Sequence, residues 1–274
     1  MVAGSIIKDI NPKGIENGVD VTSLRGLIDF PISPDGNRIV YEIPNLYIEF
    51  LICGLPMPVD PWRSVQNAPN AFVTESFIDE VAHAAGKDPL EFRLGLLKES
   101  KGAQRVLQVA AEKAGWGKPV PKGMGRGIAQ HHCMGTDIAQ VADVSVNEKT
   151  GVLKVERIVV ALDCGLAVNP DTVEAQIQGA VINALSTALK EEMRFANGGV
   201  KSANSEDYGI LRMNEVPDIE VHIVKGNDKM GGIGEPGVPP TAPAVANAFF
   251  NATGVRIRRI PLTSKVVLEA LKKT

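Results

Sequence analysis

Residues 231–262 read GGIGEPGVPPTAPAVANAFFNATGVRIRRIPL and form the most constrained stretch of this 274-residue chain. Glycine and proline fill seven of its first ten positions. Glycine lets the backbone take positive φ and approach a ligand or a strand closely, whereas proline fixes φ and removes a donor. After Pro240, apolar residues recur at helical spacing as far as Gly254, a glycine typical of helix ends. The stretch predicts a shaped loop, then a helix of small residues over 241–253 and a strand over 255–260.

Glu235 is the only charged residue in the loop that precedes this helix. An acid near a helix N-terminus stabilises the macrodipole by about 0.3–1 kcal/mol, which needs no further function. A carboxylate held by a rigid loop among apolar residues can also serve as a general base. The local pattern leaves both roles open.

The composition is that of a globular protein, with length enough for one large domain or two small ones. A net charge of −3 and dispersed Lys and Arg residues give no footprint for nucleic acid. Cys53, Cys133 and Cys164 lack CxxC spacing, so neither a disulfide framework nor a zinc or iron–sulfur site is expected. No export signal or membrane span is visible, so we expect a cytoplasmic protein that is exported only with a partner.

The remaining periodicity predicts an α+β fold of mixed sheets with packed helices, because strands and helices do not alternate strictly. We expect an irregular segment over 1–37 and one domain over 38–274, with a subdomain break near 118–124. Strands are expected at 38–53 (two, with a break), 126–133, 139–147, 152–163 and 219–224. Helices are expected at 67–85, 89–98, 103–114, 170–189 and 264–271.

Four further stretches precede the glutamate loop, and their order along the chain is used together with their residues in the comparison that follows. They are PWRSVQNAPNAFVTESFIDEVAHAAGKDPLEFR (61–93), GRGIAQHHCMGTDIAQVADVSV (125–146), DCGLAVNPDTVEAQIQGAV (163–181) and DYGILRMNEVPDIEVHIV (207–224). Together with the glutamate loop, they resemble the C-terminal part of the molybdenum-binding large subunit of the xanthine dehydrogenase and aldehyde oxidase family. The branch that they resemble most is the isoquinoline 1-oxidoreductase beta subunit. The resemblance implies the fold of a molybdopterin-binding domain.

The resemblance also implies roles for five residues. Glu235 would be the general base in the oxidation of an N-heteroaromatic or aldehyde substrate with water as the oxygen source. Arg63, Gln176 and Gly234 would lie at the molybdenum-pterin, and Trp62 would wall the substrate pocket. A guanidinium binds oxygens bidentately, and an amide offers a pterin edge both a donor and an acceptor. Without the resemblance, each of these three side chains has a simpler alternative. Arg63 could form an ion pair, Gln176 could be a solvated helix residue, and Trp62 could be a buried aromatic.

Two cysteine-containing stretches invite a metal hypothesis that we reject. His131, His132 and Cys133 are neighbours on a predicted strand, where successive side chains point to opposite faces and cannot share one ion. Cys164 is more consistent with a small buried hydrophobe. The resemblance implies a metal held through the pterin dithiolene, so no metal ligand is expected from the protein. Asn183 departs from the more apolar residues usual in the family, which puts the lining of that helix in doubt.

The Gly-rich FGR loop and the Gly-Gln-Gly stretch that hold the pterin and its nucleotide in the family are missing. The resemblance therefore implies a portion or split subunit with an incomplete site for molybdopterin cytosine dinucleotide. Its partners would be a complementary N-terminal large-subunit chain, a [2Fe–2S] small subunit and a small-molecule substrate. A non-catalytic truncated remnant or assembly module is the alternative. In both cases we expect self-association through apolar surface on 241–253 and 38–53.

Overall fold

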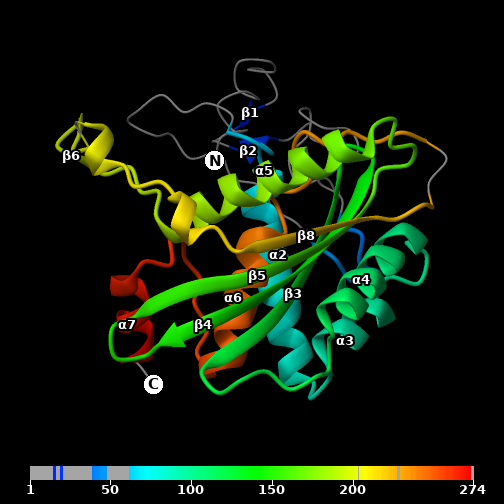
Figure 1. Ribbon diagram of the computed structural model, residues 1–274, viewed down its shortest axis with the longest axis horizontal. Coiled ribbons are helices and arrows are strands. Elements are labelled where there is room, and N and C mark those ends of the chain that lie inside the picture. The colour runs from blue at the N-terminus through cyan, green and yellow to red at the C-terminus, as the bar shows by residue number, and fades with distance from the viewer. Residues whose placement is uncertain are drawn as a thin grey trace.

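A four-stranded mixed sheet forms the centre of the computed structural model (Figure 1), which describes residues 39–47, 62–202, 204–226 and 229–272. The backbone of two short paired strands, β1 (Ile15–Glu16) and β2 (Val19–Asp20), is described as well. The central strands are β3 (Met124–Cys133), β4 (Thr136–Asn147), β5 (Val152–Asp163) and β8 (Asp218–Ile223), in that order across the sheet. The first three are antiparallel neighbours, and β8 pairs parallel with β5.

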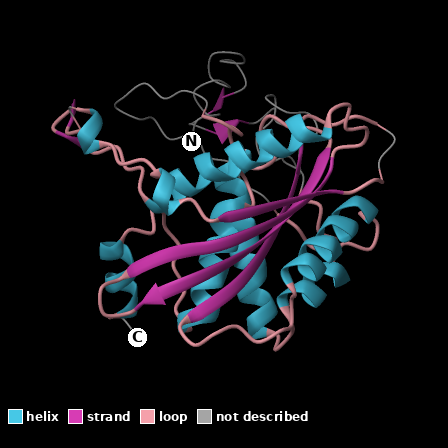
Figure 2. Ribbon diagram, in the orientation of Figure 1, coloured by secondary structure: helices cyan, strands magenta, loops and turns pink. Residues whose placement is uncertain are grey.

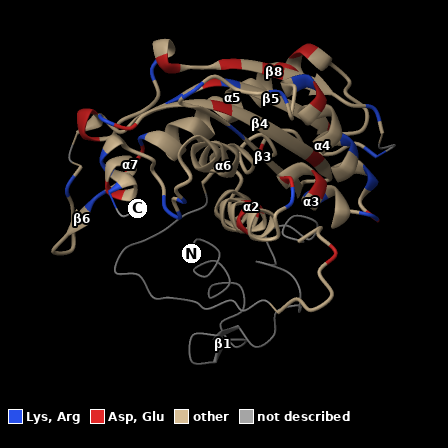
Figure 3. Ribbon diagram, turned by 90° about the horizontal axis from the view of Figure 1, so that it is seen from below, with Lys and Arg blue, Asp and Glu red and all other residues tan. Residues whose placement is uncertain are grey.

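Helices cover both faces of this sheet, as Figure 2 shows. On one face, here called the α6 face, lie α5 (Pro170–Leu189), α6 (Thr241–Thr253) and α7 (Ser264–Leu271). On the other, the α4 face, lies α4 (Lys101–Ala114). α2 (Asn67–Ala84) packs on α6, so that the sheet, α6 and α2 are stacked in Figure 3, and α3 (Pro89–Gly95) contacts α2 and α4. This arrangement confirms the predicted α+β class.

Smaller elements connect α5 to β8. They are β6 (Phe195–Ala196), β7 (Gly199–Val200) and two 3₁₀ turns, η2 (Ser205–Asp207) and η3 (Met213–Glu215). Across the described residues, no helix combines the length and the apolar character that crossing a bilayer requires.

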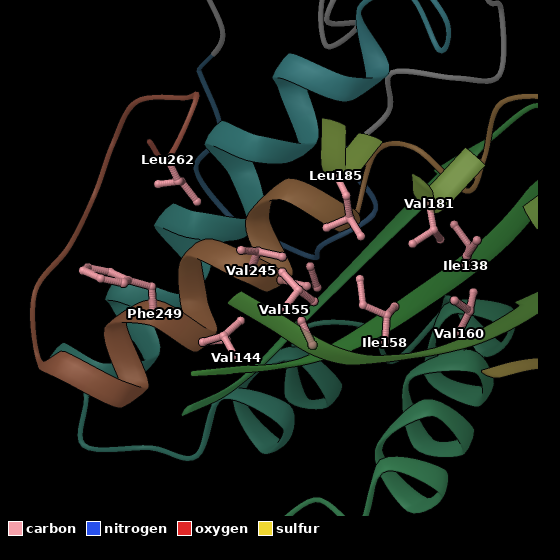
Figure 4. Close-up of a cluster of buried hydrophobic side chains, with 14 of the residues drawn as sticks. Ile138, Val144, Val155, Ile158, Val160, Val181, Leu185, Val245, Phe249 and Leu262 are labelled. Carbon is pink, nitrogen blue, oxygen red and sulfur yellow. The ribbon is translucent and has the colours of Figure 1, made fainter. Parts of the chain in front are cut away.

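Alternation along β4 divides the core between the two faces of the sheet. Ile138 and Val144 point to the α6 face, where Figure 4 shows them beside side chains of α5 and α6. Ala139 and Val141 point to the α4 face and pack against α4. All four are essentially inaccessible to solvent. The middle of the sheet is therefore buried on both faces, which explains the continuous apolar run over 158–162 in β5.

Two glycines of β3 allow α6 to lie directly on the sheet. A Cβ on Gly127 would be 2.2 Å from the Ala248 nitrogen and 2.3 Å from the Ala244 oxygen. A Cβ on Gly125 would be 2.1 Å from the Ala248 oxygen. The small residues of α6 are thus buried against backbone, and the expectation that this helix exposes an apolar surface is wrong.

Two other expectations are wrong. Residues 39–47 form no strand; the rest of the predicted pair, 48–53, lies outside the described residues. Residues 255–260 form no strand either, because Arg256 and Arg258 reach acids of α2 instead of joining a ladder. Gly179, inside the helix over 170–189, has no atom of another described segment within 4 Å of a Cβ placed on it. The helices over 170–189, 241–253 and 264–271 are confirmed.

A buried polar group, here called the Glu75 cluster, joins α2 to four other segments. The Glu75 carboxylate accepts hydrogen bonds from Tyr41 Oη (2.5 Å), Arg93 Nε (2.8 Å) and the Gln130 backbone (3.1 Å). Asn247 Nδ2 of α6 donates to the Glu75 backbone oxygen. Burial is the largest single effect and lowers the pKa of Arg93, but the charges of Glu75, Tyr41 and Asp79, together with the hydrogen bond to Glu75, outweigh it and raise that pKa above its usual value. The cluster fixes the positions of α2, α3 and α6 around β3.

Candidate cofactor and active site

The loop over 231–240 is tied at its start to the ends of the central strands. Gly231 N–H donates to the Cys164 oxygen (2.9 Å), and Gly232 N–H donates to the Met134 oxygen (2.7 Å). Thr136 Oγ1 donates to the Gly232 oxygen (2.7 Å). A Cβ on Gly231 would be 2.4 Å from Thr136 Oγ1, so this backbone approach requires glycine.

The loop is fixed equally well where it enters α6. Gln140 Nε2, buried on β4, donates to the Gly237 oxygen (2.8 Å). A Cβ on Gly237 would meet the Ala180 side chain of α5 at 2.6 Å. Between the two anchors, Val238 N–H donates to the Glu235 oxygen (3.0 Å) and closes a tight turn. The prediction of a shaped loop is confirmed.

The side chain of Glu235 is half-buried and lies between the two anchors of the loop. No hydrogen bond or ion pair joins its carboxylate to another residue within 62–202, 204–226 or 229–272. Its negative charge reaches β3: burial first, and then Glu235, raises the pKa of the Cys133 thiol above its usual range. Helix α6 begins at Thr241 and has no acid in its first turn, where dipole effects are felt. The macrodipole role is therefore disfavoured.

Arg63 brings the predicted cofactor residues together. Its Nε and Nη2 donate to the Gly234 oxygen at 2.9 and 2.6 Å, and Nη2 also donates to Gln176 Oε1 at 3.0 Å. Arg63, Gln176 and Gly234 come from the turn before α2, from α5 and from the glutamate loop, and they meet directly beside Glu235. The amide nitrogen of Gln176 remains available as a donor on an exposed helix face. The guanidinium thus binds the protein loop, a contact that sequence reasoning missed.

The turn that carries Arg63 is backbone-strained. Ser64 and Val65 have φ values of 75° and 48°, a region that non-glycine residues rarely occupy and that β-branched residues occupy least. Such strain is concentrated at functional sites, where the surroundings hold it in place. Trp62, at the start of the turn, is 37 % exposed, so it is not the fully buried aromatic of the alternative interpretation. The sequence PWRSV contains no glycine and gave no signal of this turn.

The histidines of β3 point to opposite faces of the sheet, as predicted. His131 Nε2 lies 3.0 Å from Asn67 Oδ1 of α2, whereas His132 Nδ1 lies 2.7 Å from Asp137 Oδ1 on the α4 face. Burial, followed by the charge of His132, lowers the pKa of His131 to about 3. In the part of the chain that the structure describes, no three His, Cys, Asp or Glu residues gather closely enough to hold a metal ion.

One face of α5, next to the loop, carries polar side-chain atoms that have no hydrogen-bond partner among the described residues. Gln176, Gly179 and Asn183 follow one another at helical spacing on this face. The space at Gly179 is open to 4 Å, and Asn183 Oδ1 is buried without a hydrogen-bond partner among the described residues. A buried polar atom without a partner calls for an explanation such as a ligand or another chain.

Two cavities lie elsewhere. One of about 370 Å³ is bounded by α2, α6 and residues 116–120, and one of about 410 Å³ lies between the end of α5, the start of β5 and residues 262–264. Neither is lined by Glu235, Arg63 or Gln176. The candidate site is a wall formed by the loop, the turn before α2 and α5, and it lies apart from these two cavities.

Residues 79–217, just over half of the chain, match the family model of the molybdopterin cofactor-binding domain. The chain belongs to this family. It is 33 % identical over 230 residues to the beta subunit of isoquinoline 1-oxidoreductase from Brevundimonas diminuta, covering 83 % of this chain and 29 % of that protein. It is 38 % identical over 228 residues to one subunit of the nicotinate dehydrogenase of Pseudomonas putida, covering 76 % and 19 %.

Solved structures agree with this molybdopterin-binding fold. Quinoline 2-oxidoreductase from Pseudomonas putida 86 superposes with a TM-score of 0.71 at 13 % identity, covering 79 % of this chain and 53 % of that one. Aldehyde oxidoreductase from Desulfovibrio gigas superposes with a TM-score of 0.66 at 16 % identity, covering 87 % of this chain and 44 % of that one. The resemblance inferred from the motifs is confirmed. The chain spans less than a third of the length of the two curated relatives described above.

Proposed function

We propose that this chain is a portion or split subunit of a molybdenum hydroxylase, in which Glu235 acts as general base. The substrate class is an N-heteroaromatic compound or an aldehyde, oxidised with water as the oxygen source. The observation that carries the proposal is the carboxylate of Glu235, which bonds no described residue and lies beside a carbonyl that Arg63 holds by a two-nitrogen fork. Bonds at Gly231, Gly232 and Gly237 hold the loop on the central strands, so this carboxylate is presented to a ligand from a fixed backbone.

A molybdenum-pterin fits the wall that the described residues form. The free amide nitrogen of Gln176 and the buried oxygen of Asn183 offer a donor and an acceptor to a pterin edge. The open space at Gly179 lets a flat ring approach the helix. When bound, the cofactor supplies two-electron redox chemistry. The cytosine dinucleotide form is proposed on the family resemblance alone.

The residues of this chain would divide the remaining work. Glu235 accepts a proton at a carboxylate oxygen from the water that provides the oxygen atom, while the anchored loop keeps that oxygen in one place. Trp62 offers an aromatic wall for a planar substrate. Holding base and substrate at near-attack distance is the largest contribution that such a scaffold makes, worth up to about 7–11 kcal/mol.

The proposal includes partners, because the chain lacks the loops that hold the nucleotide in the family. A complementary N-terminal large-subunit chain would complete the site, and a [2Fe–2S] small subunit would take up the electrons. The relatives named above are themselves designated as subunits, which supports an assembly. Cys133 and Cys164 are buried free thiols, which suits the reducing cytoplasm that we propose as the location.

The test is Glu235→Gln in the reconstituted complex. Loss of a general base typically lowers turnover by about 10²–10⁴-fold, and the cofactor content should not change. Glu174→Gln is the matched control, since Glu174 is an exposed acid on α5 whose carboxylate bonds only Gln178 among the described residues. Turnover that persists in the Glu235 variant would refute the role of base.

A non-catalytic remnant or assembly module is the second candidate, favoured by the fact that neither of the two cavities described above is lined by Glu235, Arg63 or Gln176. Metal and pterin analysis separates the two functions. The chain is purified alone and then together with products of neighbouring open reading frames. Molybdenum and pterin that appear only with a partner support the split enzyme, whereas their absence from every combination supports the remnant.

A further inference from the structure

The strained turn before α2 is closed by local hydrogen bonds. Val65 N–H donates to the Trp62 oxygen (2.7 Å), and the backbone N–H of Asn67 donates to the Ser64 oxygen (2.9 Å). Two residues with positive φ and a side chain cost about 1–3 kcal/mol each, so a turn of this kind persists only where its surroundings over-determine it. Local bonds alone are a weak restraint, because each contributes about 0.5–1.5 kcal/mol net.

Asn67 is completely buried, and its side chain connects this turn to the sheet. Its Nδ2 donates to the Ser64 oxygen (3.1 Å), and its Oδ1 lies 3.0 Å from His131 Nε2. Because the amide nitrogen is used as a donor, the amide oxygen must accept, and Nε2 of His131 must carry the proton. The low pKa of this imidazole keeps it neutral at physiological pH. The histidine is therefore fixed as the neutral Nε2–H tautomer.

We infer that His131 is a positioning residue for Arg63. Through Asn67 it locks the strained turn, so that the Arg63 guanidinium meets the Gly234 carbonyl beside Glu235. β3 can support the turn, since it pairs with β4 over its whole length and lies under α6. The inference rests on the proposed function only for the statement that the loop being positioned carries the base.

The neighbour of His131 provides a control within the same strand. His132 points to the α4 face and bonds Asp137, away from the turn. A change at either histidine alters β3 by one side chain, but only His131 contacts Asn67. A general loss of strand stability would affect both variants equally, whereas a positioning role belongs to His131 alone.

Trp62 reports on the turn directly. The chain has two tryptophans, so Trp116→Phe leaves Trp62 as the only one. In this background of the full chain we would measure acrylamide quenching together with the thermal midpoint. His131→Phe should raise the quenching constant about twofold, because opening of the turn exposes an indole that is 37 % exposed now. His131→Gln retains an N–H donor and should restore most of the protection, and His132→Gln should not change it.

Unchanged quenching in His131→Phe, or an equal rise in His132→Gln, would overturn the inference. If His131→Phe does not accumulate as folded protein, Asn67→Val removes the same link from the other side and should give the same rise. The ¹⁵N shifts of the imidazole provide a second criterion: protonation at Nδ1 would contradict the proposed tautomer. None of these measurements reads turnover, so a failure of Glu235 as base would be recognised separately.

Discussion

Glu75 and Glu235 both lie beside β3, yet the structure treats the two acids in opposite ways. Glu75 is 1 % exposed, and its carboxylate accepts hydrogen bonds from Tyr41, Arg93 and the backbone of Gln130. The carboxylate of Glu235 has no such partner among the described residues, although its loop is bonded at both ends. The comparison shows how one sheet supports two kinds of carboxylate: a saturated one that joins elements, and a free one that a ligand can use.

The largest expected effect is on the saturated acid. Glu75→Gln leaves the buried guanidinium of Arg93 without its main counter-charge, and breaking a buried pair costs about 3–5 kcal/mol. Glu235→Gln breaks no contact with a described residue and should change the free energy of unfolding by less than about 0.5 kcal/mol. Urea unfolding of the full chain measures both. Glu80→Gln, whose partner Arg258 is exposed, is the control and should cost about 0–1 kcal/mol. Equal losses of unfolding free energy in Glu75→Gln and Glu235→Gln would contradict the distinction between a saturated and a free carboxylate.

The second prediction concerns the packing that places both acids. Gly127→Ala forces a Cβ against the backbone of α6 and should destabilise the chain by about 1–3 kcal/mol, as overpacking does. Gly179→Ala is the counterpart in α5, where space is open, and should stabilise the helix by about 0.5–1 kcal/mol. Thermal unfolding of the two variants is the measurement. If Gly127→Ala did not change the stability of the chain, α6 would have to be able to move away from β3.

The third prediction sharpens the description of the loop around Glu235. Arg63→Lys keeps the charge but loses the two-nitrogen fork on the Gly234 oxygen. With about 1.4 kcal/mol lost, amide exchange at Val238 should become about tenfold faster, because the turn that protects it opens more often. Arg258→Lys, on an exposed ion pair, should leave that exchange rate unchanged. An unaltered exchange rate at Val238 in Arg63→Lys would show that the loop keeps its conformation without the bonds from Arg63.

The smallest effect is expected at Glu191, an acid intermediate between the two. It accepts hydrogen bonds from Tyr208 Oη (2.8 Å) and Thr187 Oγ1 (2.9 Å). Burial, and then the bond to Glu191, raise the pKa of Tyr208 from 10 to about 12. The folded state therefore holds this proton more tightly than the unfolded state, so the stabilisation is complete below pH 10 and is lost between pH 10 and 12. Tyr208→Phe should flatten the stability profile in that window, and an identical slope in the variant would contradict the assignment.

The sequence predicted the elements whose signals are local. Asn169 and Pro170 define the start of α5, and Gly254 ends α6 in the left-handed conformation expected of it. The expected strands over 139–147 and 152–163 are likewise present as β4 and β5, and residues 148–151 join them as an antiparallel hairpin. For the candidate site, the residue types at Arg63 and Gln176 could be selected only by family resemblance. Their contact could not be foreseen, because the chain between them gives no local signal of proximity.

What the sequence could not predict depends on partners distant along the chain. Arg258 bonds Glu80 across 178 positions, and this pairing replaces the strand expected over 255–260. Arg63 reaches Gly234 across 171 positions. The left-handed Ser64 and Val65 have no glycine to mark them, since tertiary contacts hold them in a conformation that their own preferences oppose. The domain boundaries near residue 37 and at 118–124 stay predictions.

The packing of α6 on Gly125 and Gly127 of β3 also determines when the sheet is covered during synthesis. Ile128 and Asn247, which join β3 to α6, are separated by 119 positions. A ribosome therefore completes β3, β4 and β5 well before the helix that covers them exists, and an uncovered apolar sheet is prone to aggregate. A nascent chain halted before residue 241 would expose that sheet at its glycines. Chaperone demand on this sheet should accordingly be greatest between the emergence of β5 and that of α6, and should end when α6 leaves the exit tunnel.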